Sequence, residues 1–137
     1  MRRRAARHGA AALAVAVLVS LAGCDVNVYL GPENEETVLS ETDLFQYSVV
    51  ALENVYFKRA WEWENTGTQA SIEIDQSITS GSVNLTLFDV SGERLFRTDL
   101  ANGVNSTTPV GFPGTWRVEI AIDGASGAFA LTLRKAP

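Results

Sequence analysis

The chain has 137 residues, a formal net charge of −5 and a hydrophobic content of 46%. Of its 11 basic residues, four lie within the first seven positions, so residues 24–137 hold seven basic residues against 16 acidic ones, a net charge of −9. A nucleic-acid-binding surface needs clustered Lys and Arg to neutralise phosphates, so this composition excludes a nucleic-acid partner. An acidic surface also gains nothing electrostatically from anionic lipid headgroups.

The N-terminus has the layout of an export signal. A basic start is followed by a small and aliphatic run over residues 10–20, which is shorter than the roughly 20 residues that a transmembrane helix needs. The basic residues are Arg2, Arg3, Arg4 and Arg7. The apolar run ends in Leu21, Ala22, Gly23 and Cys24.

These last four residues resemble the lipobox of bacterial lipoproteins at every position. The resemblance implies that residues 1–23 are removed as a signal peptide and that the Cys24 thiol accepts diacylglycerol. It places the protein in the bacterial cell envelope, anchored to a membrane by the lipid on Cys24 and facing the periplasm or the exterior. Asp25 follows directly and is similar to an inner-membrane retention signal of enteric bacteria.

Residues 24–43 are predicted to be the lipidated cysteine and an acidic tether. Gly31 and Pro32 break the chain, and the polar run over residues 33–36 contains three glutamates. Charge repulsion would extend such a spacer and lift the domain off the membrane.

Residues 44–137 are predicted to form one domain in which apolar residues recur with a period of two, as in half-buried strands. Turn signals at residues 65–68, 80–82, 89–93, 102–103 and 123–127 separate the runs, and Pro109 and residues 112–114 bracket a further loop. Six to eight short strands predict an all-β fold, a single antiparallel β-sandwich of jelly-roll or immunoglobulin-like type. The residues expected inside are Val55, Phe57, Trp61, Trp63, Ala70, Ile72, Ile74, Val83, Leu85, Leu87, Trp116, Val118, Ile120, Ile122, Phe129, Leu131 and Leu133.

Two segments near the C-terminus suggest a family. Residues 114–120, a glycine-containing turn and residues 127–133 resemble the closing hairpin of bacterial pre-peptidase C-terminal-type β-sandwiches. Residues 85–92 are similar to the strand and turn that precede that hairpin. The resemblance implies a non-catalytic domain of the kind usually attached to secreted enzymes and often linked to binding, although no enzyme domain accompanies this one.

Catalytic side chains are scarce. The only histidine, His8, lies in the predicted signal peptide, and the only cysteine, Cys24, is predicted to carry lipid. The remaining chain therefore has neither the imidazole nor the thiol needed for Ser-His-Asp or Cys-His catalysis or for a zinc site of His and Cys. We expect no catalytic residues and no enzyme activity.

Four carboxylates lie on the outward side of a predicted hairpin: Glu62, Glu64, Glu73 and Asp75. Such oxygen ligands suit Ca²⁺, although a solvated acidic face is the simpler explanation. The register would decide. With Trp63 opposite Ala70, Asp75 faces Lys58 and Glu62 faces Ser71, so most of the repulsion between carboxylates is avoided. With Trp63 opposite Ile72, Glu62 faces Glu73 directly, and a bound cation is favoured.

Trp61 and Trp63, together with Trp116, could form an aromatic platform for sugar rings, because side chains two residues apart share one face of a strand. The same two positions lie on one strand face with Val55, Phe57 and Arg59, and this mainly apolar stripe favours packing in the core. Arg59 interrupts this stripe and marks a strand end, a bulge or a buried ion pair.

The sequence thus favours a non-enzymatic, lipid-anchored envelope protein whose β-sandwich binds or scaffolds another envelope component, with a protein as the favoured partner. The alternative is a carbohydrate- or calcium-binding accessory module for a separate secreted enzyme.

Overall fold

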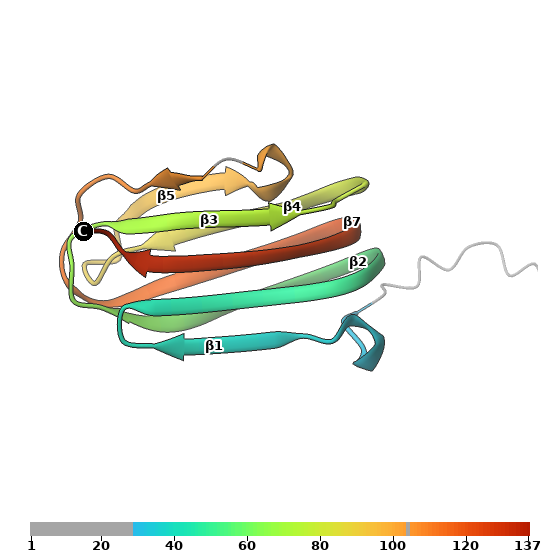
Figure 1. Cartoon of the computed structure of the whole chain (residues 1–137), viewed down its shortest axis with the longest axis horizontal. Coiled ribbons are helices and arrows are strands. Elements are labelled where there is room, and N and C mark those ends of the chain that lie inside the picture. The colour runs from blue at the N-terminus through green and yellow to red at the C-terminus, as the bar shows by residue number, and fades with distance from the viewer. Residues whose placement is uncertain (1–28, 104) are drawn as a thin grey trace, which may run out of the picture.

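The computed structural model of the protein describes residues 29–103 and 105–137, where nearly all of the regular structure is β-strand (Figure 1). The predicted signal peptide, the lipid site Cys24 and Asp25 lie outside the described residues. Within the described ranges, no helix is long and apolar enough to cross a membrane.

The described chain forms seven strands that pair only in antiparallel fashion. They are β1 (Thr37–Glu41), β2 (Leu44–Asn65), β3 (Ala70–Gln76), β4 (Ser80–Phe88), β5 (Arg94–Asp99), β6 (Ser106–Thr107) and β7 (Gly114–Lys135). Short 3-10 helices precede β1 and follow β5, namely η1 (Pro32–Asn34) and η2 (Leu100–Asn102). The all-β, antiparallel prediction is confirmed, and the strand number falls within the predicted range.

Hydrogen bonds join these strands into one sheet with the order β1-β2-β7-β3-β6, while β4 pairs with β7 and β5 pairs with β4. The predicted jelly-roll or immunoglobulin-like sandwich would instead have two separate sheets. The difference arises from β2 and β7, which are 22 residues long and continue from one half of the sheet into the other.

Both long strands bend, β7 at the predicted turn of residues 123–127 and β2 at residues 49–56, where no turn was predicted. The β2–β7 register shifts between Val49 and Tyr56, and Ala51 and Asn54 have positive φ angles. In β7, Gly127 has φ +118°, and a Cβ there would lie 2.2 Å from the carbonyl oxygen of Ser77. These residues bend the strand without ending it. The predicted closing hairpin of residues 114–133 is therefore wrong, because both of its arms belong to one bent strand.

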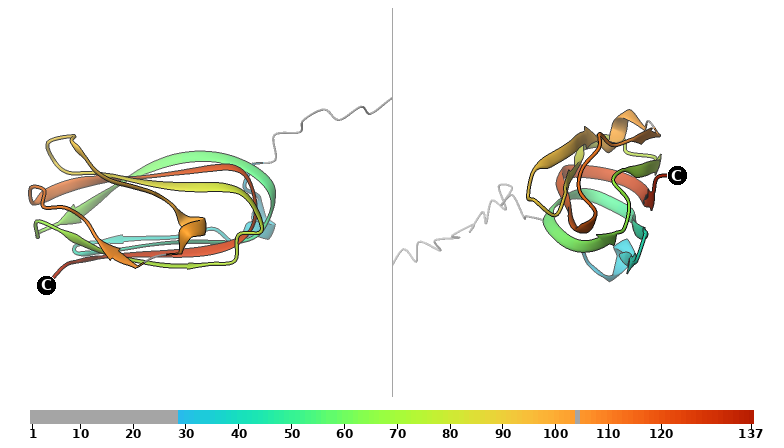
Figure 2. Two further views of the ribbon diagram at one scale, coloured as in Figure 1. Left: turned by 90° about the horizontal axis from the view of Figure 1, so that it is seen from above. Right: turned by 90° about the vertical axis from the view of Figure 1, so that its left-hand side faces the viewer.

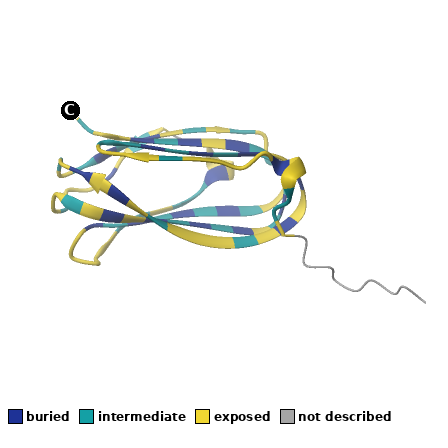
Figure 3. Cartoon of the chain, turned by 90° about the horizontal axis from the view of Figure 1, so that it is seen from below, coloured by how far each residue is buried: buried dark blue, intermediate teal, exposed yellow. Residues whose placement is uncertain are grey.

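The bend folds the sheet over, so that the two arms of β2 face each other (Figure 2). The rings of Tyr47 in the first arm and Trp61 in the second have centroids 4.6 Å apart. Buried residues alternate with half-buried or exposed ones along the strands (Figure 3). The predicted inward positions of β4 and of both arms of β7 are all buried, as the period of two requires.

Residues 31–43 belong to the folded domain, which corrects this part of the predicted tether over residues 24–43. β1 pairs with β2 from Thr37 opposite Ser48 onward. Before it, Asn34 is buried, and its Nδ2 donates hydrogen bonds of 3.0 Å to the carbonyl oxygens of Val50 and Ala51 at the bend. The Asn34 amide satisfies carbonyl groups at the irregular part of β2. The domain therefore begins well before residue 44.

β1 also connects the two halves of the sheet. The Ser40 hydroxyl donates to the carbonyl oxygen of Glu62 at 2.9 Å, and Trp63 Nε1 donates to that of Glu41 at 3.0 Å. Both bonds bridge β1 and the second arm of β2, so they close the side on which the folded sheet would otherwise be open.

Candidate binding site

The predicted tryptophan platform is not formed. Trp63 is 1% exposed and meets Trp116 edge to face, with ring centroids 5.8 Å apart and an interplanar angle of 82°. Trp61 is half-buried against Tyr47 and Phe45. The core alternative therefore holds for Trp63 and Trp116, which offer no ring face to a sugar.

The four carboxylates of the predicted calcium site are not brought together. β2 and β3 do not pair with each other, because both pair with β7. Trp63 lies opposite Trp116, so both predicted registers are wrong. Glu62 and Glu64 lie beside the first arm of β7, opposite Arg117 and Thr115, whereas Glu73 and Asp75 lie beside the second arm, opposite Thr132 and Ala130. Among the described residues, no group of three or more metal-ligating side chains could hold an ion.

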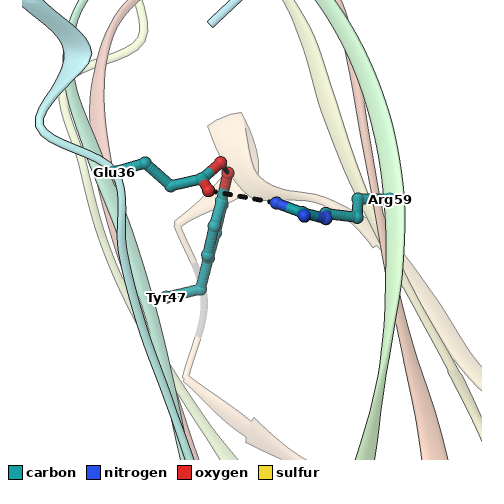
Figure 4. A network of polar contacts seen from close by, with 3 residues as sticks. All are labelled: Glu36, Tyr47 and Arg59. Atoms are coloured by element: carbon teal, nitrogen blue, oxygen red, sulfur yellow. Dashed lines mark hydrogen bonds and ion pairs between the residues drawn. The ribbon is translucent and has the colours of Figure 1, made fainter. Parts of the chain in front are cut away.

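Arg59 forms an ion pair within a regular part of β2 (Figure 4). None of its three predicted explanations holds, because the residue lies neither at a strand end nor at a bulge, and its ion pair is exposed. Its guanidinium lies 3.2 Å from Glu36 Oε1, and the Tyr47 hydroxyl donates to Glu36 Oε2 at 2.9 Å. The ion pair is not buried, because the Arg59 side chain is 53% exposed. Burial, followed by the hydrogen bond to Glu36, raises the pKa of the Tyr47 hydroxyl far above its usual value. The network holds a neutral phenol and fastens the segment before β1 to the sheet.

The turn after β4 and the loop before β7 are fastened to each other by Asp89. This carboxylate is 3% exposed, and it accepts hydrogen bonds from the backbone N–H of Phe112 at 3.1 Å and from that of Ser91 at 2.9 Å. The Ser91 hydroxyl also donates to it and is the main cause of a pKa below the usual range for Asp89. The two loops therefore form one rigid unit, which we call the loop tip (residues 89–93 and 108–113).

Two further contacts fix the same backbone. Trp116 Nε1 donates to the carbonyl oxygen of Phe112 at 2.8 Å, and the Gly111 N–H donates to that of Thr68 at 2.7 Å. The indole of Trp116 is fully buried, so the loop is connected directly to the core.

The loop tip exposes three apolar side chains despite this rigid backbone. Val90 is 50% exposed, Val110 68% and Phe112 62%. Single exposed apolar residues are common on protein surfaces, and three of them on one hydrogen-bonded unit make the loop tip the candidate contact surface. The loop tip lies at the opposite end of the molecule from residue 29, where the described chain begins (Figure 1).

Sequence reasoning identified both loops but not their union. The turn at residues 89–93 and the loop around Phe112 were each visible as breaks in the alternating pattern. The sequence does contain one signal for this surface. Phe112 lies between Gly111 and Pro113, outside any alternating run, so packing in the core does not account for an aromatic residue there. The hydrogen bond from Phe112 to Asp89 spans 23 residues and leaves no local pattern.

No protein-family model and no curated protein sequence matches the chain. Among solved structures, the crystal structure of SPBc2 prophage-derived protein YomS is similar, with 15% sequence identity and a TM-score of 0.32. The match covers 69% of this chain and 96% of the YomS chain. A similarity of this size supports no statement about function.

Proposed function

We propose that the protein is a non-enzymatic lipoprotein of the bacterial cell envelope, anchored through Cys24, whose domain binds another envelope protein with its loop tip. The observation that carries this proposal is the rigid loop tip with its exposed Val90, Val110 and Phe112. Preorganised apolar side chains lose little conformational entropy on binding, which favours a protein partner with a matching apolar surface.

The position of the loop tip suits an anchored binding protein. Five residue steps separate Cys24 from Tyr29, so the connection can span at most about 18 Å. The bend in the long strands would then lie close to the membrane, and the loop tip would project away from it. Asp25 supports the inner membrane where bacteria use an acidic residue at this position as a retention signal.

The side-chain chemistry supports a non-catalytic role. His8 and Cys24, the only histidine and cysteine, both precede the described domain. The one strongly shifted phenol, Tyr47, donates to Glu36 and is held neutral rather than activated.

We also propose that the folded sheet is a variant of the β-sandwich, related to the pre-peptidase C-terminal type. Support comes from the facing arms of β2, whose Tyr47 and Trp61 rings are in contact, and from the inward alternation of β4 and β7. The continuous β7 departs from the closing hairpin of that family.

The anchor is tested with Cys24→Ser. Loss of the thiol should move the protein from the detergent phase to the aqueous phase in a phase-separation assay, because lipid chains contribute about 0.8 kcal/mol per buried CH₂. Continued partitioning of the variant with the detergent would contradict the anchor.

The partner surface is tested by photo-cross-linking in the native bacterium. A photoreactive residue at position 110 should give one protein adduct of defined mass, and the same residue at position 73, exposed on β3, serves as the matched control. The additional change Phe112→Asp should abolish the adduct. Adducts at both positions, or none at position 110, would overturn the proposal.

A further inference from the structure

The outward face of the sheet carries a hollow with a volume of about 420 Å³, and two of its lining residues, Phe88 and Arg94, directly flank the turn of the loop tip. It extends over four strands, β5, β4, the first arm of β7 and the second arm of β2. Its floor is made of small or neutral polar side chains, Asn84, Thr86 and Ala121.

The charge of this hollow is opposite to that of the chain. Lys58, Arg94 and Arg97 line it, against one acid, Glu119, whereas residues 24–137 have seven basic and 16 acidic residues. Three of those seven cations are therefore gathered in one hollow. Arg117 lies directly beside it, with its guanidinium 5.7 Å from the centre of the Phe88 ring. Such a concentration of cations on an acidic protein attracts anions to this face.

The single acid is already paired. Glu119 forms ion pairs of 3.3 Å with both Lys58 and Arg117, and its side chain is 18% exposed. Among the described residues, neither Arg94 nor Arg97 forms an ion pair, because β5 is an edge strand and their cross-strand partners are Phe88 and Thr86. The two arginines are free to bind a ligand.

The cations lie at two separated borders of the hollow. Arg97 is on β5 and Lys58 on β2, with β4 and β7 between them. Three strand spacings separate these borders, about 14 Å. A ligand with anionic groups at intervals would contact the cations of both borders at once.

We propose that this hollow binds a segment of an anionic polysaccharide. The guanidinium forks of Arg94 and Arg97 match carboxylate and phosphate oxygens, and the Asn84 amide and Thr86 hydroxyl provide neutral partners for sugar hydroxyls. The hollow and the loop tip share no residue, so the two binding proposals can be tested separately.

Calorimetry on the lipidated protein in a non-ionic detergent tests the ligand class. We expect saturable binding to oligogalacturonate, if carboxylates are recognised, or to a phosphomannan, if phosphates are, and none to fully methyl-esterified oligogalacturonate. Equal affinity for polyglutamate would overturn recognition of a saccharide. Absence of heat with both anionic polymers would overturn the site.

Charge-reversal variants test the location. Arg97→Glu and Arg94→Glu should each weaken binding at least tenfold, since each removes a charge-assisted contact and adds repulsion. Arg134→Glu makes the same charge change at an exposed position on the second arm of β7, outside the hollow, and should change affinity less than twofold. Equal losses in all three variants would show a general charge effect and overturn the proposal. Phe112→Asp should leave glycan binding intact, which separates this site from the loop tip.

Discussion

The two ends of the molecule are fixed by different means. At the bend, the backbone itself is constrained: β2 and β7 change direction through positive φ angles at Ala51, Asn54 and Gly127, and Gly127 lies directly against the backbone of Ser77. At the loop tip, side chains hold an ordinary backbone in place through Asp89 and its donors. The bend, where the backbone itself is constrained, tolerates few substitutions. The loop tip can vary its outward residues as long as the buried carboxylate of Asp89 stays in place.

The largest effect is expected at the bend. Gly127→Ala places a Cβ 2.2 Å from the Ser77 carbonyl oxygen at φ +118°, so the strand cannot keep its course. We expect a loss of about 4 kcal/mol or more in the free energy of unfolding, measured by urea denaturation. Gly92→Ala is the matched control, because its φ is +82° but no atom lies within 4 Å, and it should cost about 1–2 kcal/mol. Equal losses in the two variants would contradict the close-approach argument.

A smaller effect is expected from the carboxylate of the loop tip. Asp89→Ala removes the acceptor for Phe112 and Ser91 and should lower the free energy of unfolding by about 2–3 kcal/mol. The exposed Asp123 gives the control, since Asp123→Ala should change stability by less than about 0.5 kcal/mol. A loss below 1 kcal/mol for Asp89→Ala would show that the loops are held mainly by other contacts.

The same carboxylate makes part of the stability depend on pH. Because hydrogen bonds lower the pKa of Asp89 in the folded state, its contribution is complete above its unfolded pKa, near 3.8, and is lost as the pH falls through the folded value. Denaturation between pH 5 and pH 2 should therefore show a shallower decline for Asp89→Asn than for the unmodified chain. Asp43, whose pKa is also lowered, through hydrogen bonds from Thr66, leaves a residual slope in the variant. Parallel curves would contradict a role for Asp89.

The smallest effect on stability is expected from the outer surface of the loop tip. Phe112→Asp alters a side chain that is 62% exposed, while its backbone N–H and carbonyl keep their bonds to Asp89 and Trp116. The melting temperature should shift by no more than a few degrees. A shift as large as that of Asp89→Ala would show that Phe112 supports the fold rather than a partner.

The side-chain periodicity made much of this fold predictable. The inward positions of β4 and β7 follow from the alternation of apolar and polar residues, which does not depend on which strands pair with them. Strand continuity was not predictable in the same way, because Gly124 and Gly127 are as typical of a turn as of a bend in a continuous strand. The expected pairing of residues 55–64 with residues 70–75 failed because β7, almost 50 residues later, lies between them in the sheet.

The candidate surfaces were harder to predict for the same reason. The calcium and tryptophan hypotheses both assumed that neighbours in sequence are neighbours in space. Both candidate surfaces instead combine residues distant in sequence: Asp89 with Phe112 at the loop tip, and Lys58 with Arg97 around the hollow. Arg94 and Arg97 were visible in the sequence, but their proximity to Lys58 depends on the placement of β4 and β7 between them.

The pairing of β1 with β2 has a mechanical consequence for an anchored protein. β1 enters at the bend and runs toward the loop tip, in the same direction that a pull between the membrane and a bound partner would act (Figure 1). Its hydrogen bonds to β2 lie across that direction, so a pull on the N-terminus stretches all of them together instead of opening them one by one. The ladder of β1 is therefore in shear, the arrangement in which a short strand best resists force.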